Sequence, residues 1–362
     1  MHTLRQWGNR VICAVMVGSL LLGGTAMAAP VKPATPLDNL QKMVEVMTDA
    51  TSAEYRWDIH VNSRSPRYQY IPGKVTKANP YPLATQKVVG TKVGKVDVSL
   101  EGRQGEEQGE MHIIANVKID NKTTLSVDAD VRLVDKAIYF KLNKVSGLDG
   151  SMEENEALTK YLGRWIYVSP DMVKEEIGTD RFENQLNLLQ TKKKELNEDQ
   201  QKVLNRFKEL IVRHKVFTIR TLRSEKVNGV DTFHYSITLN KRGLANAIVE
   251  YATKDEGKVM TPAEIKKFHA NFDKHTKSLV LPTIEVWIGK NDFTLRKMTM
   301  KTGFSLKTVG LDWTLNLSTK VVYTSVNKPV LVEAPAPVRT FEEFERALSG
   351  TSSEVSDTQE TL

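Results

Sequence analysis

Residues 125–142 read LSVDADVRLVDKAIYFKL, and apolar and polar side chains alternate along them. Every second residue from Leu125 to Leu133 is apolar, and the positions between are Ser126, Asp128, Asp130 and Arg132. A period of two residues is typical of a β-strand with one face toward a core and one toward water. Ile138, Phe140 and Leu142 begin a further strand of the same kind. This stretch therefore predicts an antiparallel sheet.

The same alternation extends in both directions from this stretch. It covers residues 55–61 and 93–119, then 216–239 around the turn dipeptide Asn228-Gly229, and finally 283–326. Helical patterns separate these blocks, at 35–50, 203–211, 244–251 and 261–275, and Thr-Pro pairs open the first and the last of them. Blocks of strands and helices in this order favour an α+β fold over an alternating parallel sheet.

Residues 64–86 interrupt the strand pattern. Four prolines and three tyrosines fall within them, which predicts a long loop. In a protein that acts as an adaptor, we expect this loop to be the contact for its protein partner in the cell envelope.

The N-terminus has the features of an export signal. Arg5 and Arg10 precede the apolar run of residues 11–22, and Ala26-Met27-Ala28 offers small residues for a signal peptidase. Cleavage between Ala28 and Ala29 is predicted, with the mature protein in the periplasm or at the extracellular face of the envelope. An uncleaved N-terminal membrane anchor is the alternative.

The rest of the chain then divides into three parts. Residues 29–34 are a linker, residues 35–328 form one domain with helical insertions near 169–215 and 241–281, and residues 329–362 are a Pro-rich and then acidic disordered tail. The only cysteine, Cys13, lies in the signal segment, so the mature chain has no disulfide and no thiolate.

Charge and motifs exclude several function classes. Loss of Arg5 and Arg10 lowers the net charge of +7 by two, to +5, and this charge is spread along the chain. Such a distribution predicts no nucleic-acid binding and only weak attraction to a membrane surface. No phosphate-binding loop, nucleophile elbow or zinc motif is present. We therefore expect no enzyme, no catalytic residue, no metal and no cofactor.

Three segments together resemble a known family. Residues 137–142 (AIYFKL) and 163–168 (GRWIYV) form the first pair, residues 227–235 (VNGVDTFHY) form a hairpin, and residues 282–289 (PTIEVWIG) lead into 295–298 (LRKM). This pattern, over roughly 53–326, resembles LolA-like and LppX-like periplasmic lipoprotein carriers and lipid-binding proteins. The chain lacks the lipobox cysteine of the lipid-anchored members.

The resemblance implies a strongly curved antiparallel β half-barrel with helices packed on its concave face. It also implies an apolar cavity that binds a lipid or the acyl chain of a lipoprotein. The alternative is a structural or adaptor module whose core is filled. Large side chains on the strands that carry the pattern are the expected cavity lining: Phe140, Leu142, Trp165, Phe233, Tyr235, Trp287 and Leu315.

Overall fold

A computed structural model describes residues 35–71, 85–105, 108–147, 156–172, 198–255, 257, 259–305 and 313–348. The predicted signal segment, with the cleavage expected between Ala28 and Ala29, and the predicted linker lie outside these residues, and so does the end of the tail. Within the described residues, no helix is long and apolar enough to cross a membrane.

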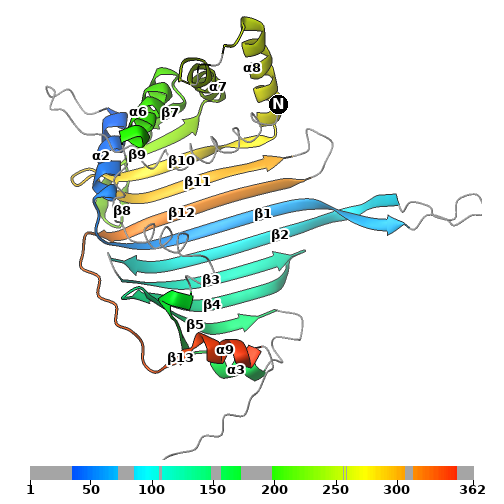
Figure 1. Ribbon diagram of the computed structural model, residues 1–362, viewed down its shortest axis with the longest axis vertical. Helices are drawn as coiled ribbons and strands as arrows, with labels where there is room; N and C mark the ends of the chain where they lie inside the picture. The colour runs from blue at the N-terminus through cyan, green and yellow to red at the C-terminus, as the bar shows by residue number, and fades with distance from the viewer. Residues whose placement is uncertain are drawn as a thin grey trace, which may run out of the picture.

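One 13-stranded sheet organises the described chain (Figure 1). Its neighbours are antiparallel except for one parallel pair, β13 with β6. No described pairing joins β13 to β7 at the other end, so the sheet is curved but open. Across the sheet the order is β13 (Val338–Thr340), β6 (Trp165–Val168), β5 (Ala137–Ser146), β4 (Lys122–Val134), β3 (Gly109–Ile119), β2 (Thr85–Gln104), β1 (Ala53–Ile71), β12 (Thr314–Val326), β11 (Leu295–Ser305), β10 (Leu279–Gly289), β9 (Val230–Leu239) and β7 (Phe217–Thr221), and β8 (Lys226–Val227) pairs with β9.

Tight turns fix the register of several hairpins. Asp120 and Asn121 both have positive φ, of 52° and 64°, and Asn228 and Gly229 have φ of 49° and 79°. Positive φ at both central residues matches the right-handed twist of the flanking strands. The hairpin predicted at Asn228-Gly229 is confirmed.

Residues 64–86 differ from the prediction. β1 continues to Ile71 and β2 begins at Thr85, so the two strands pair as a long arm that extends past the ends of the strands beside it (Figure 1). Residues 64–71 and 85–86 therefore belong to strands, and the prediction of a loop there is wrong. Pro66 is compatible with the arm because an arm strand has an open edge, where a missing N–H breaks no ladder bond.

Helices cover the two sides of the concave face. α2 (Pro36–Thr48) packs on β9–β11, whereas α6 (Glu198–Arg213), α7 (Lys241–Glu250) and α8 (Pro262–Thr276) gather at the β7 edge (Figure 1). The π-helix η1 (Tyr251–Asp255) continues α7. α3 (Glu156–Tyr161) and α9 (Phe341–Leu348) cover β5 and β6. The predicted α+β class is confirmed, and α6, α7 and α8 lie within the ranges expected for the two helical insertions.

The helix starts follow from capping. The Thr35 hydroxyl accepts a hydrogen bond from the Asp38 N–H at 3.2 Å, and the Asp38 carboxylate accepts one from the Thr35 N–H at 2.7 Å. Thr261 and Glu264 repeat this capping box at α8. Each box satisfies N–H groups that a helix start leaves without partners.

The C-terminal region corrects the domain boundary predicted at residue 328. Residues after β12 run past the ends of neighbouring strands of the sheet (Figure 1). There Gln108 donates to the Val330 carbonyl at 2.9 Å, and Val332 is buried. β13 then pairs with β6, and Phe344 of α9 is buried against β5. Residues up to 348 therefore belong to the folded domain, because their apolar side chains complete its core.

Candidate functional site

The pairing register places apolar side chains in rows on one face of the sheet. One row runs without a break over nine strands and has Trp57 at its centre. Directly paired residues lie on the same face, so the whole row faces the same way. In order its members are Leu142, Ala129, Ile113, Leu100, Trp57, Val321, Met298, Val286 and Tyr235.

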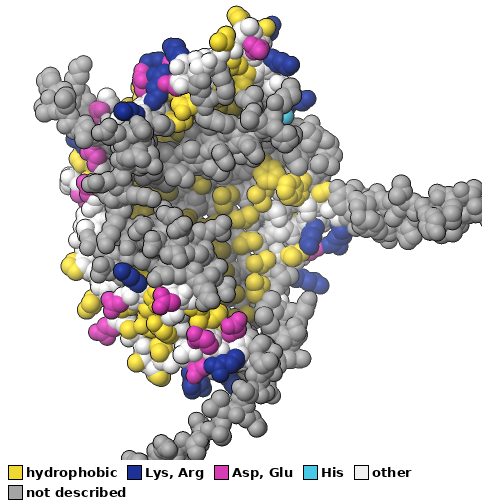
Figure 2. All heavy atoms as spheres, in the orientation of Figure 1, with side chains coloured by type: hydrophobic (Ala, Val, Ile, Leu, Met, Phe, Trp, Pro, Cys, Tyr) yellow, Lys and Arg dark blue, Asp and Glu magenta, His cyan; other side chains and the backbone are white. Residues whose placement is uncertain are grey.

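Burial varies along this row, and Val321 and Ala129 within it are buried at 7% and 8% exposed. Tyr235 and Val286 are buried under α2, and Leu142 packs in the cluster with α9. Trp57, midway between, is 40% exposed. Figure 2 shows hydrophobic side chains over these middle strands. We call the half-exposed or exposed apolar side chains of β1, β2, β3 and β12 the apolar floor: Trp57, Ile59, Val98, Leu100, Ile113, Ala115, Leu315 and Leu317.

The apolar floor has no charged side chain, and hydroxyl groups stand at its border. The Trp57 indole N–H donates to the hydroxyl of Thr319. Tyr55 and Tyr323 pair with ring centroids 6.4 Å apart, and burial raises the pKa of both phenols. Protonated phenols at the border of an apolar surface can donate hydrogen bonds to a polar group of a ligand.

Five of the seven predicted lining residues lie on the apolar face, in three environments. Leu315 lies on the apolar floor, opposite Ser63. Phe140 and Leu142 are on the same face but pack against α9, with the Phe140 and Phe344 rings 5.8 Å apart. Phe233 and Tyr235 pack in the α2 cluster, and the Asn39 side chain donates to the Tyr235 hydroxyl at 2.8 Å. Ligand contact by these five residues stays a prediction.

Trp165 and Trp287 lie on the opposite face, so their predicted place on the apolar face is wrong. Trp165 pairs with Lys141, and the guanidinium of Arg132 and the ammonium of Lys141 both lie 4.9 Å from its ring. Trp287 stacks on His234 at 4.1 Å. In both strands the neighbouring residues are also apolar, so the sequence does not show which ones face the core.

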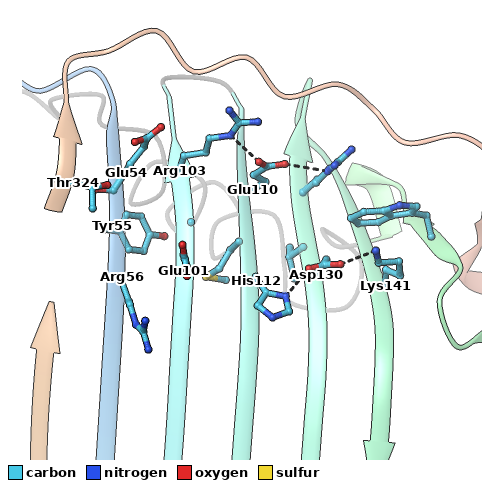
Figure 3. Close-up of a pocket in the computed structure, with 15 residues that line it drawn as sticks. Glu54, Tyr55, Arg56, Glu101, Arg103, Glu110, His112, Asp130, Lys141 and Thr324 are labelled. Atoms are coloured by element: carbon cyan, nitrogen blue, oxygen red, sulfur yellow. Dashed lines mark hydrogen bonds and ion pairs between the residues drawn. The ribbon is translucent and has the colours of Figure 1, made fainter. Parts of the chain in front are cut away.

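Polar residues that sequence analysis assigned to a solvated outer face form two ladders there (Figure 3). They border a groove of about 460 Å³ near one end of the sheet. Arg103 and Arg132 lie on either side of Glu110, at 2.7 and 3.3 Å. In the next row His112 and Lys141 both lie 2.7 Å from Asp130.

The ion pairs of these two ladders suit a structural role better than acid–base catalysis. Partial burial acts to raise the pKa of Asp130, but hydrogen bonds from Lys141, Asn143 and His112 outweigh it and lower the pKa to about 2. A carboxylate held ionised in this way cannot act as a general acid near neutral pH. In the described part of the chain, no group of three or more His, Cys, Asp or Glu side chains is placed to hold a metal ion.

No family model matches the chain, and no curated protein matches it in sequence. Among solved structures, it is similar to the lipoprotein LppX of Mycobacterium tuberculosis, with 12% identity over 82% of this chain and 97% of that one and a TM-score of 0.29. LprF of Mycobacterium bovis matches with 13% identity over 83% and 96% and a TM-score of 0.31. The likeness is one of fold alone.

Proposed function

We propose that this protein binds the acyl chain of a lipid or lipoprotein on the apolar floor. The observation that supports the proposal is the change in burial across the sheet. Helices bury the apolar face on both sides, whereas most apolar side chains of the middle strands are half-exposed and, of those in the row around Trp57, only Val321 is buried. A continuous exposed apolar surface is unfavourable in water and marks an interaction site.

The chemistry of the floor favours a flexible aliphatic chain. Its side chains are mainly Val, Leu and Ile from neighbouring strands, so they offer a broad surface without charged groups. Each CH₂ group removed from water contributes about 0.8 kcal/mol. An extended acyl chain crossing several strands would therefore bind without any specific polar contact.

Neighbouring residues of β3 provide a matched test. Ile113 pairs with Leu100 on the apolar floor, whereas Ile114 pairs with Ser99 on the polar face and is 39% exposed. Ile113→Gln should weaken binding of a fluorescent fatty acid about tenfold, since burial of an aliphatic side chain contributes about 1.5–3 kcal/mol. Ile114→Gln should leave the affinity within about twofold.

Displacement of the probe by unlabelled fatty acid and the melting temperature of each variant complete the experiment. Equal losses of affinity in the two variants would contradict binding at the floor. Absence of saturable binding by the wild-type protein would favour the adaptor alternative.

A further inference from the structure

Helix α8 stands at the outer corner of the described fold, beyond the β7 edge (Figure 1). Its packed side holds Phe268 and Phe272, whose rings lie 5.9 Å apart, and Phe272 joins the cluster formed with α6 and α7. Thr276 at its end is buried, and its carbonyl accepts a hydrogen bond from the Lys241 ammonium at 2.8 Å. The helix is thus anchored along one side only.

The other side of α8 is basic. Lys266, Lys267, Lys274 and Lys277 are all exposed, and the spacing of 3.6 residues per turn places them within one half of the helix surface. None of the four forms an ion pair with a carboxylate of the described residues, although the charge of Lys267 adds to the hydrogen bonds from Thr261 in lowering the pKa of Glu264.

Two acidic residues accompany these lysines on α8. Glu264 is engaged in the capping box, where its carboxylate accepts from the Thr261 N–H at 2.8 Å and from the Thr261 hydroxyl at 2.9 Å. Asp273 lies between the basic side and His269, where burial and the charge of Arg242 lower the pKa of the histidine in spite of the opposing charge of Asp273. The outward side of α8 therefore keeps a net positive charge.

Exposed aliphatic side chains flank the helix. Val259, shortly before α8, is 94% exposed, and Val280, shortly after it, is 51% exposed. Next to Val280, Leu279 pairs with Phe304, whose ring lies 4.9 Å from that of the exposed Trp313. A basic helix with an exposed aliphatic side chain near each end matches the interface of an anionic bilayer, which offers phosphate charge and then acyl carbon.

We propose that α8, with Val259 and Val280, docks this protein on an anionic lipid surface. Charge complementarity supplies the attraction, and each lysine near such a surface contributes about a fivefold gain in affinity. The two valines add contact with the upper part of the acyl layer. Docking does not require a ligand on the apolar floor, so it can fail or succeed independently of the proposed function.

Vesicle co-sedimentation with the full chain tests the docking. Wild-type protein should bind phosphatidylcholine vesicles that contain phosphatidylglycerol, bind pure phosphatidylcholine vesicles poorly, and dissociate at high salt. The variant K267E/K274E/K277E should bind the anionic vesicles about 100-fold more weakly.

A control of equal charge separates position from net charge. Lys226, Lys320 and Lys328 are exposed and lie on other parts of the sheet and its edge. K226E/K320E/K328E changes the net charge by the same amount and should retain most of the affinity. The variant V259S/V280S should lose about tenfold without a change in salt dependence. Circular dichroism and melting temperature check the fold of each variant.

Three outcomes would overturn the docking site. The first is no binding of the wild type to anionic vesicles. The second is an equal loss in the two triple variants, which would show a response to net charge alone. The third is α8-dependent binding to soluble polyglutamate with no vesicle binding, which would identify an acidic polypeptide as the occupant.

Discussion

Leu40→Asp is expected to be strongly destabilising because α2 closes one side of the apolar floor through this side chain. Leu40 is 9% exposed and packs in the cluster that includes Val286, Ile288 and Leu295. The next residue, Gln41, is exposed. Gln41→Asp is therefore a control with the same new charge one residue away.

The size of the effect follows from the burial of Leu40. Truncation of a buried Leu to Ala costs about 2–5 kcal/mol, and a carboxylate in its place adds the penalty of burying a charge. We expect at least about 4 kcal/mol, which corresponds to a fall in melting temperature of about 6 °C for a domain of this size. Gln41→Asp should remain within about 0.5 kcal/mol, as is usual for an exposed position. Helix propensity and the helix dipole act nearly alike on both changes.

Thermal melting followed by circular dichroism, with urea unfolding at one pH, measures both variants. Equal destabilisation by the two changes would refute the assigned face of α2. A small effect of Leu40→Asp with normal acyl binding would also refute the role of α2 in closing the floor.

Two further predictions concern a glycine and a carboxylate. Gly243→Ala should destabilise the protein by more than 1 kcal/mol in urea unfolding, since the new Cβ would lie 2.4 Å from the His214 carbonyl oxygen; exposed Arg242→Ala should change little. Asp130 has a folded-state pKa of about 2, below its ordinary value, so its ionised form stabilises the fold above about pH 4 and this stabilisation is lost as the pH falls toward 2. Asp130→Asn should therefore be less stable than wild type at neutral pH, by a margin that shrinks on acidification; a margin constant down to pH 2 would contradict the assignment.

The sequence predicts most of the local elements because their signals are local. Alternation marks residues 125–133 as a strand, Asn228-Gly229 marks a hairpin turn, and Thr261 with Glu264 marks the start of α8. Each signal depends on residues within a few positions of one another. The resemblance of the strand motifs to LolA-like and LppX-like carriers predicted the curved antiparallel fold class.

The place of each large side chain was decided by tertiary pairing. In the strands of Trp165 and Trp287 consecutive residues are apolar, so the sequence leaves open which of them face the core, and a shift of one residue reverses every side chain. Pairing of Phe140 with Ile166 and of Val286 with Tyr235 settles it, and both tryptophans then lie on the polar face. These pairings join residues far apart in the chain.

What the sequence alone determined about this protein is therefore its strands, turns, helix starts and fold class. Only the tertiary structure decided that residues 338–348 complete the core, that residues 64–71 belong to a strand arm, and that the floor around Trp57 stays half-exposed. The physical reason is that local conformation depends on neighbouring residues, whereas burial depends on which distant elements pack together and where they leave a surface uncovered.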